Sequence, residues 1–420
     1  MIAASPTVTR VLAADLCTGC GLCAGVSSGA IGMATDAAGF ARPRQFCPVT
    51  EAAEARIAGS CPGSVIAPWS KEERHQHPLW GPWRQTLTGA ASDPEVRFHG
   101  ASGGALSALL IHALEQGTVD RVLHIEPDPK HPTGNRVRWS STREEVLAGA
   151  GSRYASSSPL AAIEEALAQG GRFAFVGKPC DVSALRQLGR YDTRVAKHVP
   201  LVLSFFCGGL PSSAGAADIL RAMGLEQGDV VEFRYRGQGW PGLTVARTAD
   251  GRSGEMSYAE SWGRHLSRQV QFRCKICPDA VGGVADIACA DAWYGDAAGY
   301  PSFEEKDGRS LIMSRTAAGE AFLHSAQAAA AIETAPLPIE EIERMQPAQA
   351  QRKRMIAART AAVRASLQPV PIMRDLEVGA AARQGRPYDI THNFLGTMRR
   401  VLLRRWRKWR ITAGGRGQPA

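Results

Sequence analysis

The sequence predicts a mixed α/β fold: a layered α/β domain, preceded by a small cysteine-rich unit and followed by a helical tail. Two observations lead to this prediction. Strand-like and helix-like patterns alternate between residues 122 and 225. The ten cysteines gather in groups rather than spreading evenly through the chain, at positions 17, 20, 23, 47, 61, 180, 207, 274, 277 and 289.

Length and composition agree with a core-forming protein of several parts. A chain of 420 residues, 44% hydrophobic and 21% charged, has room for about two or three domains. We expect a cysteine-rich unit over residues 1–70, a Pro- and Trp-rich linker over 71–98, an α/β domain over 99–330, and an extension of helices and loops over 331–420.

A cytoplasmic, reducing environment is predicted. The first fifteen residues lack a basic segment followed by a long apolar one, and no run of about 18 apolar residues occurs. Clustered cysteines suit ligand sets better than a disulfide framework in a chain of this size.

The densest group of cysteines lies near the N-terminus. Cys17, Cys20 and Cys23 have C-x-x-C-x-x-C spacing, which is more typical of an iron–sulfur cluster than of tetrahedral zinc, the alternative. Ser27 occupies the position where the usual ferredoxin run has its fourth cysteine. Cys47 and Cys61 both precede a proline, and we favour Cys61 as the fourth ligand because it closes the unit just before the linker.

The α/β alternation contains three strands and three helices that the pattern places clearly. The predicted strands are 122–125, 172–176 and 199–206, and the predicted helices are 159–169, 182–188 and 212–223. Ahead of them, Ser102 is expected to cap a helix whose first turn holds Gly103 and Gly104 and which continues over 105–116. Bare N–H groups there could approach a phosphate; the alternative is a tight loop packed against a neighbour.

A second group of cysteines comes from positions far apart in the sequence. Cys274 and Cys277 form a C-x-x-C pair, which alone suits half a zinc site, a redox dithiol or two buried thiols. Cys180 opens a helix after a predicted strand, and Cys207 follows another strand. Because both lie at strand ends, we expect them to join the pair as ligands.

Residues 237–242 match the G-x-G-x-x-G pattern, but we reject a dinucleotide-binding role. That fingerprint must open a helix, whereas Pro241 and the residues after it predict a strand that ends in a hairpin turn at Asp250 and Gly251.

Seven segments together resemble the family of coenzyme F420 hydrogenase/dehydrogenase beta subunits. This family includes 7-hydroxymethyl chlorophyll a reductase and a ferredoxin-dependent divinyl chlorophyllide 8-vinyl reductase. The segments are CTGCGLC (17–23), ASGGALSALL (101–110), GSRYASS (151–157), GKPCDVSALRQL (177–188), FFCGG (205–209), YRGQGWPG (235–242) and RCKICPDAVGGVADIACADAW (273–293).

The resemblance implies an α/β domain that binds FAD, preceded by a ferredoxin-like N-terminal unit. It also implies one or two 4Fe–4S clusters that supply the flavin with electrons. It assigns one cluster to Cys180, Cys207, Cys274 and Cys277. It assigns flavin contacts to Ser102, Gly103, Gly104, Arg153, Tyr154, Ser157, Tyr235, Arg236, Gly237, Trp240 and Gly242. Arg153 stands where the family usually has lysine, and Ala290 where it usually has glycine, so the substrate stays open.

We therefore expect an oxidoreductase that passes electrons from a ferredoxin-like donor through two 4Fe–4S clusters to FAD and on to an organic acceptor. The first cluster would use Cys17, Cys20, Cys23 and Cys61, leaving Cys47 and Cys289 spare. The alternative is a non-catalytic electron-transfer subunit that docks on a larger oxidoreductase or membrane assembly. No residue is assigned as a catalytic acid.

The C-terminal tail is basic and amphipathic. The net charge is +9, and eight basic residues but no acidic ones follow residue 398. Leu395, Met398, Leu402, Trp406 and Trp409 recur at helical spacing. A helix over 395–410 could therefore contact the inner membrane surface peripherally. The alternatives are a solvated terminus, a helix packed on the body, and a docking surface for an acidic electron donor; nucleic acid is disfavoured because no binding fold accompanies the patch.

Overall fold

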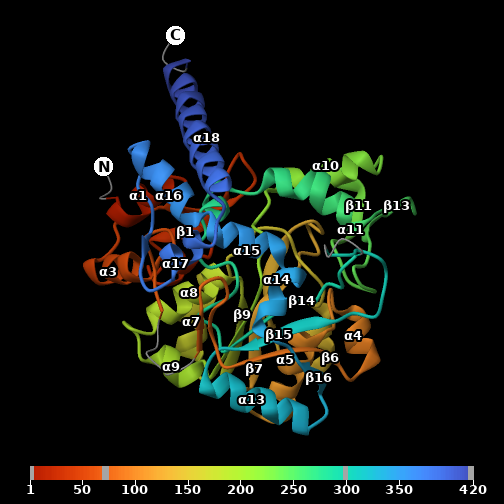
Figure 1. Ribbon diagram of the computed structural model, residues 1–420. Helices are drawn as coiled ribbons and strands as arrows, with labels where there is room; N and C mark the ends of the chain where they lie inside the picture. Colours follow the sequence, from red (N-terminus) through yellow and green to blue (C-terminus); the bar gives the residue numbers. More distant parts are fainter. Residues whose placement is uncertain (1–3, 69–74, 297–300, 415–420) are drawn as a thin grey trace.

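The computed structural model describes residues 4–68, 75–296 and 301–414, and a mixed β-sheet lies at its centre (Figure 1). Within the described residues this sheet has eight strands. The inner strands β14, β10, β9 and β7 are parallel, and the strands outside them are antiparallel. Their order is β16 (Ile332–Pro336), β6 (Gln85–Ala91), β15 (Ser310–Ser314), β14 (Ile287–Asp291), β10 (Leu201–Phe205), β9 (Phe173–Gly177), β7 (Arg121–Pro127) and β8 (Asn135–Ser140).

Helices cover both faces of the sheet, as burial of its two apolar faces requires. On one face, α5 (Ala105–Glu115) and α13 (Ala317–Ala328) pack against Leu203 and Ile312. On the other face, α7 (Ile163–Gln169) and α8 (Pro179–Leu188) pack against Phe175. The predicted strands and the helices over 159–169, 182–188 and 212–223 are confirmed, with bounds shifted by a few residues.

The start of α5 differs from the prediction. The helix begins at Ala105, so Gly103 and Gly104 precede it, and the Ser102 side chain does not cap it. Gly104 occupies the N-cap position in the left-handed region, at φ 72°, where a side chain would be strained. The glycine pair therefore makes the bend that leads into the helix.

The N-terminal unit packs directly on the α/β layers. It contains α1 (Pro6–Ala13), α2 (Leu22–Gly25), the antiparallel pair β1 (Ile31–Thr35) and β2 (Ala41–Gln45), and α3 (Glu51–Ser60). Ser5 caps α1, and its hydroxyl also donates to Glu54 of α3 at 2.6 Å. Leu22 and Ile57 share a core with Val182 and Leu185 of α8, so the unit is joined to the sheet through a common interior.

Two of the predicted boundaries do not match the architecture. The segment 71–98, expected to be a linker, contains the interior strand β6 as well as β4 (His75–His77), β5 (Gly81–Trp83) and α4 (Pro94–His99). The compact part was expected to end near residue 330, yet β16 pairs with β6 beyond that point. The prolines and tryptophans around β6 hid its strand pattern, because pairing on both sides, rather than local alternation, holds it in the sheet.

A smaller sheet and a C-terminal group of helices complete the structure. The smaller sheet consists of β11 (Val230–Arg234), β12 (Thr244–Thr248) and β13 (Ser253–Met256), which confirms the predicted hairpin, and α10 (Ser213–Ala222) packs on it. Beside it, a short α11 (Tyr258–Glu260) is followed by a π-type turn and a 3₁₀ turn.

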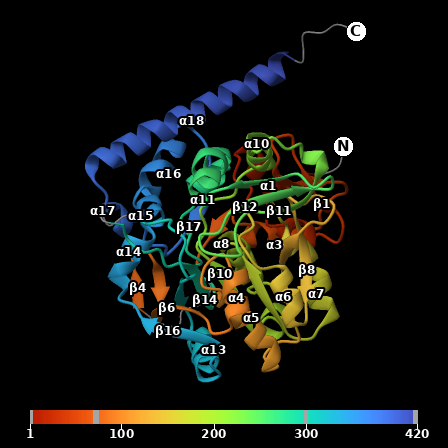
Figure 2. The same cartoon turned by 90° about the vertical axis from the view of Figure 1, so that its right-hand side faces the viewer.

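The remaining helices and short strands are α6 (Arg143–Ala148), α9 (Arg194–His198), α12 (Phe272–Lys275), α14 (Ile342–Met345), α15 (Pro347–Arg354), α16 (Ile356–Ala365), α17 (Val378–Arg383), α18 (Pro387–Gly414), and β3 (Val65–Ile66) paired with β17 (Ile372–Met373). Figure 2 shows α18 running along the body and projecting past it. In the part of the chain that the structure describes, no helix has the length and hydrophobicity needed to cross a membrane.

Candidate functional site

A cavity of about 530 Å³ opens at the carboxyl ends of the parallel strands. Residues that follow β9 and β10, including Lys178 and Cys207, form part of its wall, and Cys289 and Asp291 of β14 form another part. Ligands of open α/β sheets bind at this edge, where successive strand-to-helix turns converge. The volume lies within the range of about 300–1,000 Å³ that is typical of cofactor sites.

The N-terminal end of α5 faces this cavity. Gly104, Ala105 and Ser107 line it, and the first N–H groups of a helix have no partner within the helix. Ser102 and Gly103 are engaged elsewhere: the Ser102 hydroxyl and the Gly103 N–H each lie 3.0 Å from the Ser310 hydroxyl. This segment therefore presents the positive end of a helix to the cavity, and the hydroxyl of Ser102, although that residue is part of the lining, is held by β15.

Gly103 is required by packing. A Cβ atom there would lie 2.7 Å from the Gly89 carbonyl oxygen of β6 and 2.8 Å from the Ser310 nitrogen of β15. The absence of a side chain lets the bend press against two strands of the sheet. This holds the start of α5 at the cavity edge.

The segment 151–157 lies along the cavity wall, but its arginine is fully engaged by the protein. Arg153 donates to Asn135 Oδ1 at 2.9 Å and to three backbone carbonyls at 2.7–3.0 Å, and its guanidinium lies 5.2 Å from the Tyr235 ring centre. Tyr154 packs on Trp262 with ring centres 4.9 Å apart. Ser157 accepts a hydrogen bond from Lys178 Nζ at 3.2 Å.

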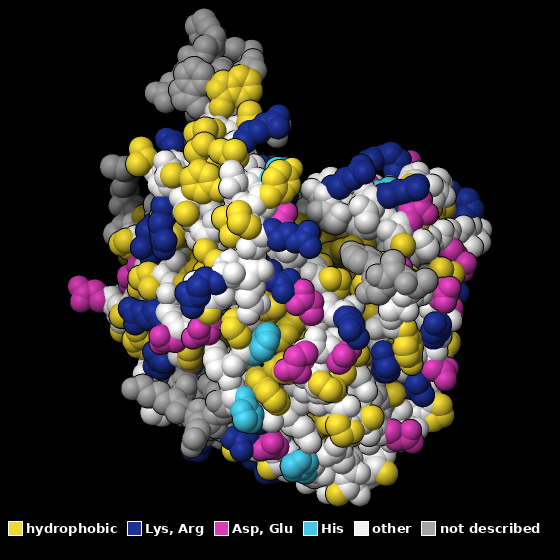
Figure 3. Space-filling view, in the orientation of Figure 1, with side chains coloured by type: hydrophobic (Ala, Val, Ile, Leu, Met, Phe, Trp, Pro, Cys, Tyr) yellow, Lys and Arg dark blue, Asp and Glu magenta, His cyan; other side chains and the backbone are white. Residues whose placement is uncertain are grey.

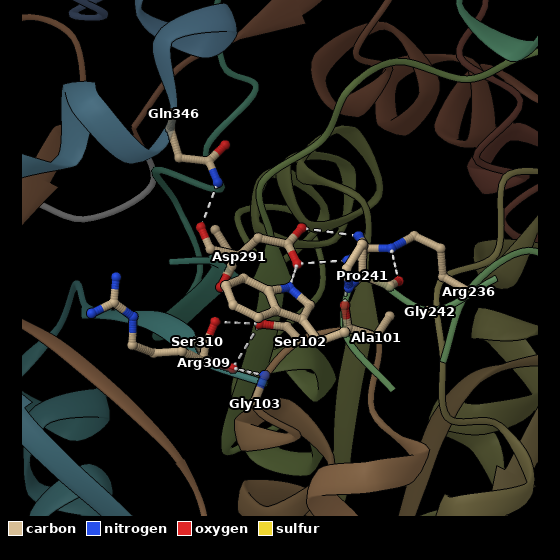
Figure 4. Close-up of polar contacts among 12 residues, drawn as sticks. Ala101, Ser102, Gly103, Arg236, Pro241, Gly242, Asp291, Arg309, Ser310 and Gln346 are labelled. Carbon is tan, nitrogen blue, oxygen red and sulfur yellow. Dashed lines mark hydrogen bonds and ion pairs between the residues drawn. The ribbon is translucent and has the colours of Figure 1, made fainter. Parts of the chain in front are cut away.

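The loop 235–242 is tied to the end of β14 by a buried charge pair (Figure 4). Arg236, which is 2% exposed, donates to both carboxylate oxygens of Asp291 at 2.8 and 3.0 Å. It also donates to the carbonyls of Ala101 and Pro241, at 2.6 and 2.9 Å. Trp240 Nε1 donates to the same carboxylate at 2.7 Å. The arginine thus fixes the loop against the entrance of α5.

The eleven predicted flavin contacts divide into two groups. Those that line the cavity are Ser102, Gly104, Arg153, Tyr154, Ser157 and Arg236. Those that lie outside its described lining are Gly103, Tyr235, Gly237, Trp240 and Gly242. Tyr235 is 1% exposed, and its hydroxyl donates to the Thr133 carbonyl at 2.8 Å, so its place in the structure is in the supporting core.

Four cysteines surround a second, smaller cavity next to the first. They are Cys180 at the start of α8, Cys207 in the turn after β10, Cys274 in α12 and Cys277 just after that helix. The Leu210 N–H lies 3.4 Å from Cys274 Sγ, and Gln271 Nε2 lies 3.5 Å from the same sulfur. Burial, together with the neighbouring Cys274, raises the pKa of the Cys207 thiol to about 12. Thiolates here need nearby positive charge.

Three cations supply such charge. Arg352 of α15 donates to the Cys207 and Gly208 carbonyls, at 3.0 and 2.5 Å. Burial raises the pKa of the Cys180 thiol, and the positive charge of Lys178 opposes that rise. Burial also raises the pKa of the Cys277 thiol, and the charge of Arg273 opposes it. Arg352 was not predicted as a site residue, because it reaches the cysteines only through the fold, whereas Lys178 lies two residues before Cys180 in the motif 177–188. The extension predicted over residues 331–420 thus contributes part of the site through Arg352.

The three sulfurs of the N-terminal motif lie close to Cys61. The charges of Cys17, Cys20 and Cys61 all act on Cys23, and burial raises the pKa of Cys61 to about 11. Cys47 is exposed and stands apart, whereas Cys289 is buried in β14 and lines the larger cavity. The residues near Cys61 therefore match the set that we favoured, and Cys47 does not join them.

Within the described residues, no three Cys, His, Asp or Glu side chains converge closely enough to share one metal ion. A 4Fe–4S cluster makes a different demand. Each of its cysteines binds a different iron, so the sulfurs lie around a cube rather than around a single ion. The four cysteines around the smaller cavity fit that donor geometry better than a zinc site.

An α/β sheet whose ligand cavity is bordered by a group of cysteines is an arrangement typical of an oxidoreductase. Two family models match most of this region. The N-terminal model of the coenzyme F420 hydrogenase/dehydrogenase beta subunit matches residues 86–164, and the C-terminal model of the same family matches residues 170–340. The chain belongs to the coenzyme F420 hydrogenase/dehydrogenase beta subunit family, as its motifs predicted.

Individual relatives agree with this assignment. The coenzyme F420 hydrogenase subunit beta of Methanococcus voltae is 26% identical over 261 residues, which cover 61% of this chain and 85% of that protein. The F420-dependent formate dehydrogenase 1 subunit beta of Methanococcus maripaludis is 26% identical over 232 residues, which cover 53% of this chain and 57% of that one.

A chain of the F420-reducing [NiFe] hydrogenase complex from Methanosarcina barkeri shares the fold. The TM-score is 0.53 at 21% identity, covering 72% of this chain and 99% of that one.

Proposed function

We propose that the protein is an iron–sulfur flavoprotein oxidoreductase that takes electrons from a ferredoxin-like donor and delivers them to an organic acceptor. One observation carries the proposal: the four-cysteine cavity and the larger cavity share a wall formed by Lys178, Cys207, Gly209, Leu210 and Arg352. Each of these residues borders both cavities, so a cluster in one cavity and a flavin in the other would be separated by the thickness of one residue. Electron transfer between two cofactors requires such a short separation.

The N-terminal unit extends this arrangement. Thr18, the neighbour of Cys17, lines the four-cysteine cavity. Arg273 donates to the Pro62 carbonyl at 3.0 Å, next to Cys61, and its charge also acts on Cys277. The two cysteine sets therefore adjoin each other, which supports a sequence of N-terminal cluster, second cluster and larger cavity.

The residues present fit the proposed cofactors. FAD, when bound, supplies the exchange between single electrons and hydride, and iron–sulfur clusters supply single electrons. The N-terminal end of α5 would hold negatively charged phosphates of FAD at Gly104 and Ala105. Tyr258 and Trp262 add aromatic surface to the same wall. Arg236, held by Asp291, would keep loop 235–242 fixed beside the bound cofactor.

The test is anaerobic purification followed by analysis of iron, sulfide and flavin. We expect about eight irons and one FAD per chain. Cys61→Ser should lose the N-terminal cluster, whereas Cys47→Ser, its matched control, should keep the full iron content because Cys47 is exposed and apart. Zinc in place of iron, or equal iron loss in both variants, would disprove the cysteine assignment. Absence of flavin after reconstitution would disprove the FAD proposal.

The names of the relatives favour a second candidate, an electron-transfer subunit of a larger oxidoreductase complex, because each is described as the subunit of a hydrogenase or dehydrogenase. Steady-state turnover separates the candidates. Reduction of an organic acceptor by the isolated, cofactor-loaded chain supports the enzyme. Activity that appears only with a co-purifying partner supports the role as a subunit.

A further inference from the structure

Helix α18 has an inner face that is fixed to the body. Thr397 and Val401 are 1% and 2% exposed, and Arg359 donates to Asn393 Oδ1 at 2.8 and 3.0 Å. Arg404 pairs with Asp15 at 2.6 Å, and its guanidinium lies 3.6 Å from the Phe272 ring centre. These contacts hold the helix in one orientation, so the fold determines which side chains lie on its outer face.

The outer face carries an apolar stripe. Leu395 is 53% exposed, Leu402 50% and Trp406 52%, and Leu403 beside them is 43% exposed. At about 100° per residue, positions 395, 402 and 406 lie together, on the side away from Thr397 and Val401. Figure 3 shows hydrophobic side chains gathered along the projecting helix, with Lys or Arg side chains beside them. The predicted positions from residue 407 on have side chains outside the described part of the chain.

Positive charge borders this stripe. Arg399 and Arg405 are both exposed and lie on opposite sides of its centre, at about 40° and about 80°. Arg405 also donates to the Ser366 carbonyl at 3.1 Å, which ties this side of the helix to the body. With eight basic and no acidic residues after position 398, the segment complements a negatively charged surface.

We propose that the outer face of α18 binds an anionic lipid leaflet, with Leu395, Leu402 and Trp406 in the interface and the arginines at the headgroups. Leucine and tryptophan between cationic borders are the composition of helices that lie in a membrane surface. A protein partner fits less well. Four half-exposed side chains offer on the order of 400 Å², below the roughly 800 Å² that each partner contributes to a stable protein interface.

This attachment would orient the protein. Val401 on the inner face shares a core with Cys17, Leu16 and Ile276, so α18 lies between the N-terminal cysteine unit and the lipid. One helix diameter, about 10 Å, would separate the unit from the leaflet. Under the proposed function, electrons would then enter from a donor at the membrane surface; the lipid binding itself does not depend on that function.

Co-sedimentation with vesicles tests the proposal. The full-length protein is mixed with vesicles of phosphatidylcholine alone or with roughly 30% phosphatidylglycerol, an anionic surface that attracts basic residues. We expect binding to the anionic vesicles that weakens as NaCl is raised. The variant Leu395→Gln/Leu402→Gln should bind at least about tenfold more weakly, because two leucines are lost from the interface.

Leu367→Gln is the matched control, since Leu367 is 85% exposed but lies outside α18, and it should bind like the parent. Iron and flavin content are measured on the same samples, so loss of cofactor is distinguished from loss of binding. Failure of the full-length protein to bind anionic vesicles at low salt would overturn the proposal. So would equal binding by the stripe variant, or self-association that the stripe variant abolishes without any vesicle binding.

Discussion

Asp291→Ala should destabilise the protein strongly, because it strands a buried cation. Asp291 accepts two hydrogen bonds from Arg236 and one from Trp240, at 2.7–3.0 Å. Arg236 is 2% exposed, and without the carboxylate its charge would be balanced by neutral dipoles, because the carbonyls of Ala101 and Pro241 keep two of its bonds. Removing one partner of a buried pair costs about 3–5 kcal/mol, and we expect a loss in that range.

Urea unfolding of the cofactor-loaded protein measures this loss. The control is Glu341→Ala, whose partner Arg344 is 74% exposed; this variant should unfold like the parent. The double variant Asp291→Ala/Arg236→Met should be less destabilised than the sum of the two single variants, because no charge is left unpaired. If Asp291→Ala proved as mild as the control, or if the two losses simply added, the buried-pair reasoning would be refuted.

Three further changes have defined outcomes. Arg352→Gln removes positive charge beside Cys207, so the reduction potential of the cluster proposed there should fall in a redox titration. Arg352→Lys keeps the charge and should lower the potential less, and an unchanged potential in Arg352→Gln would contradict an electrostatic role for this arginine. Burial lowers the pKa of His124 to about 4, so the fold favours its neutral form. Stability should therefore fall by about 3 kcal/mol as the pH drops from about 6.5 to 4, and His124→Gln should flatten that slope. Gly103→Ala should cost about 1–3 kcal/mol by overpacking against Gly89, whereas Gly379→Ala, with open space around it, should not destabilise.

Features that depend on local spacing could be predicted before the fold was known. The alternation over residues 122–225 predicted β7, β9 and β10, because strand and helix periods differ and can be read along the chain. The motif of Cys17, Cys20 and Cys23 brings its sulfurs together within a few residues. The apolar spacing of the tail predicted a stripe, which α18 exposes at Leu395 and Leu402.

Contacts between distant residues required the folded chain. Both Cys47 and Cys61 precede proline, yet the packing of the N-terminal unit brings Cys61 to the other sulfurs and leaves Cys47 exposed. Arg352 reaches Cys207 across 145 residues, and no local period records such a contact. β6 likewise has an unpromising sequence and is held by pairing with β15 and β16. Side chains and strands of this kind are placed by the burial and hydrogen bonding of the whole chain, which local spacing does not encode.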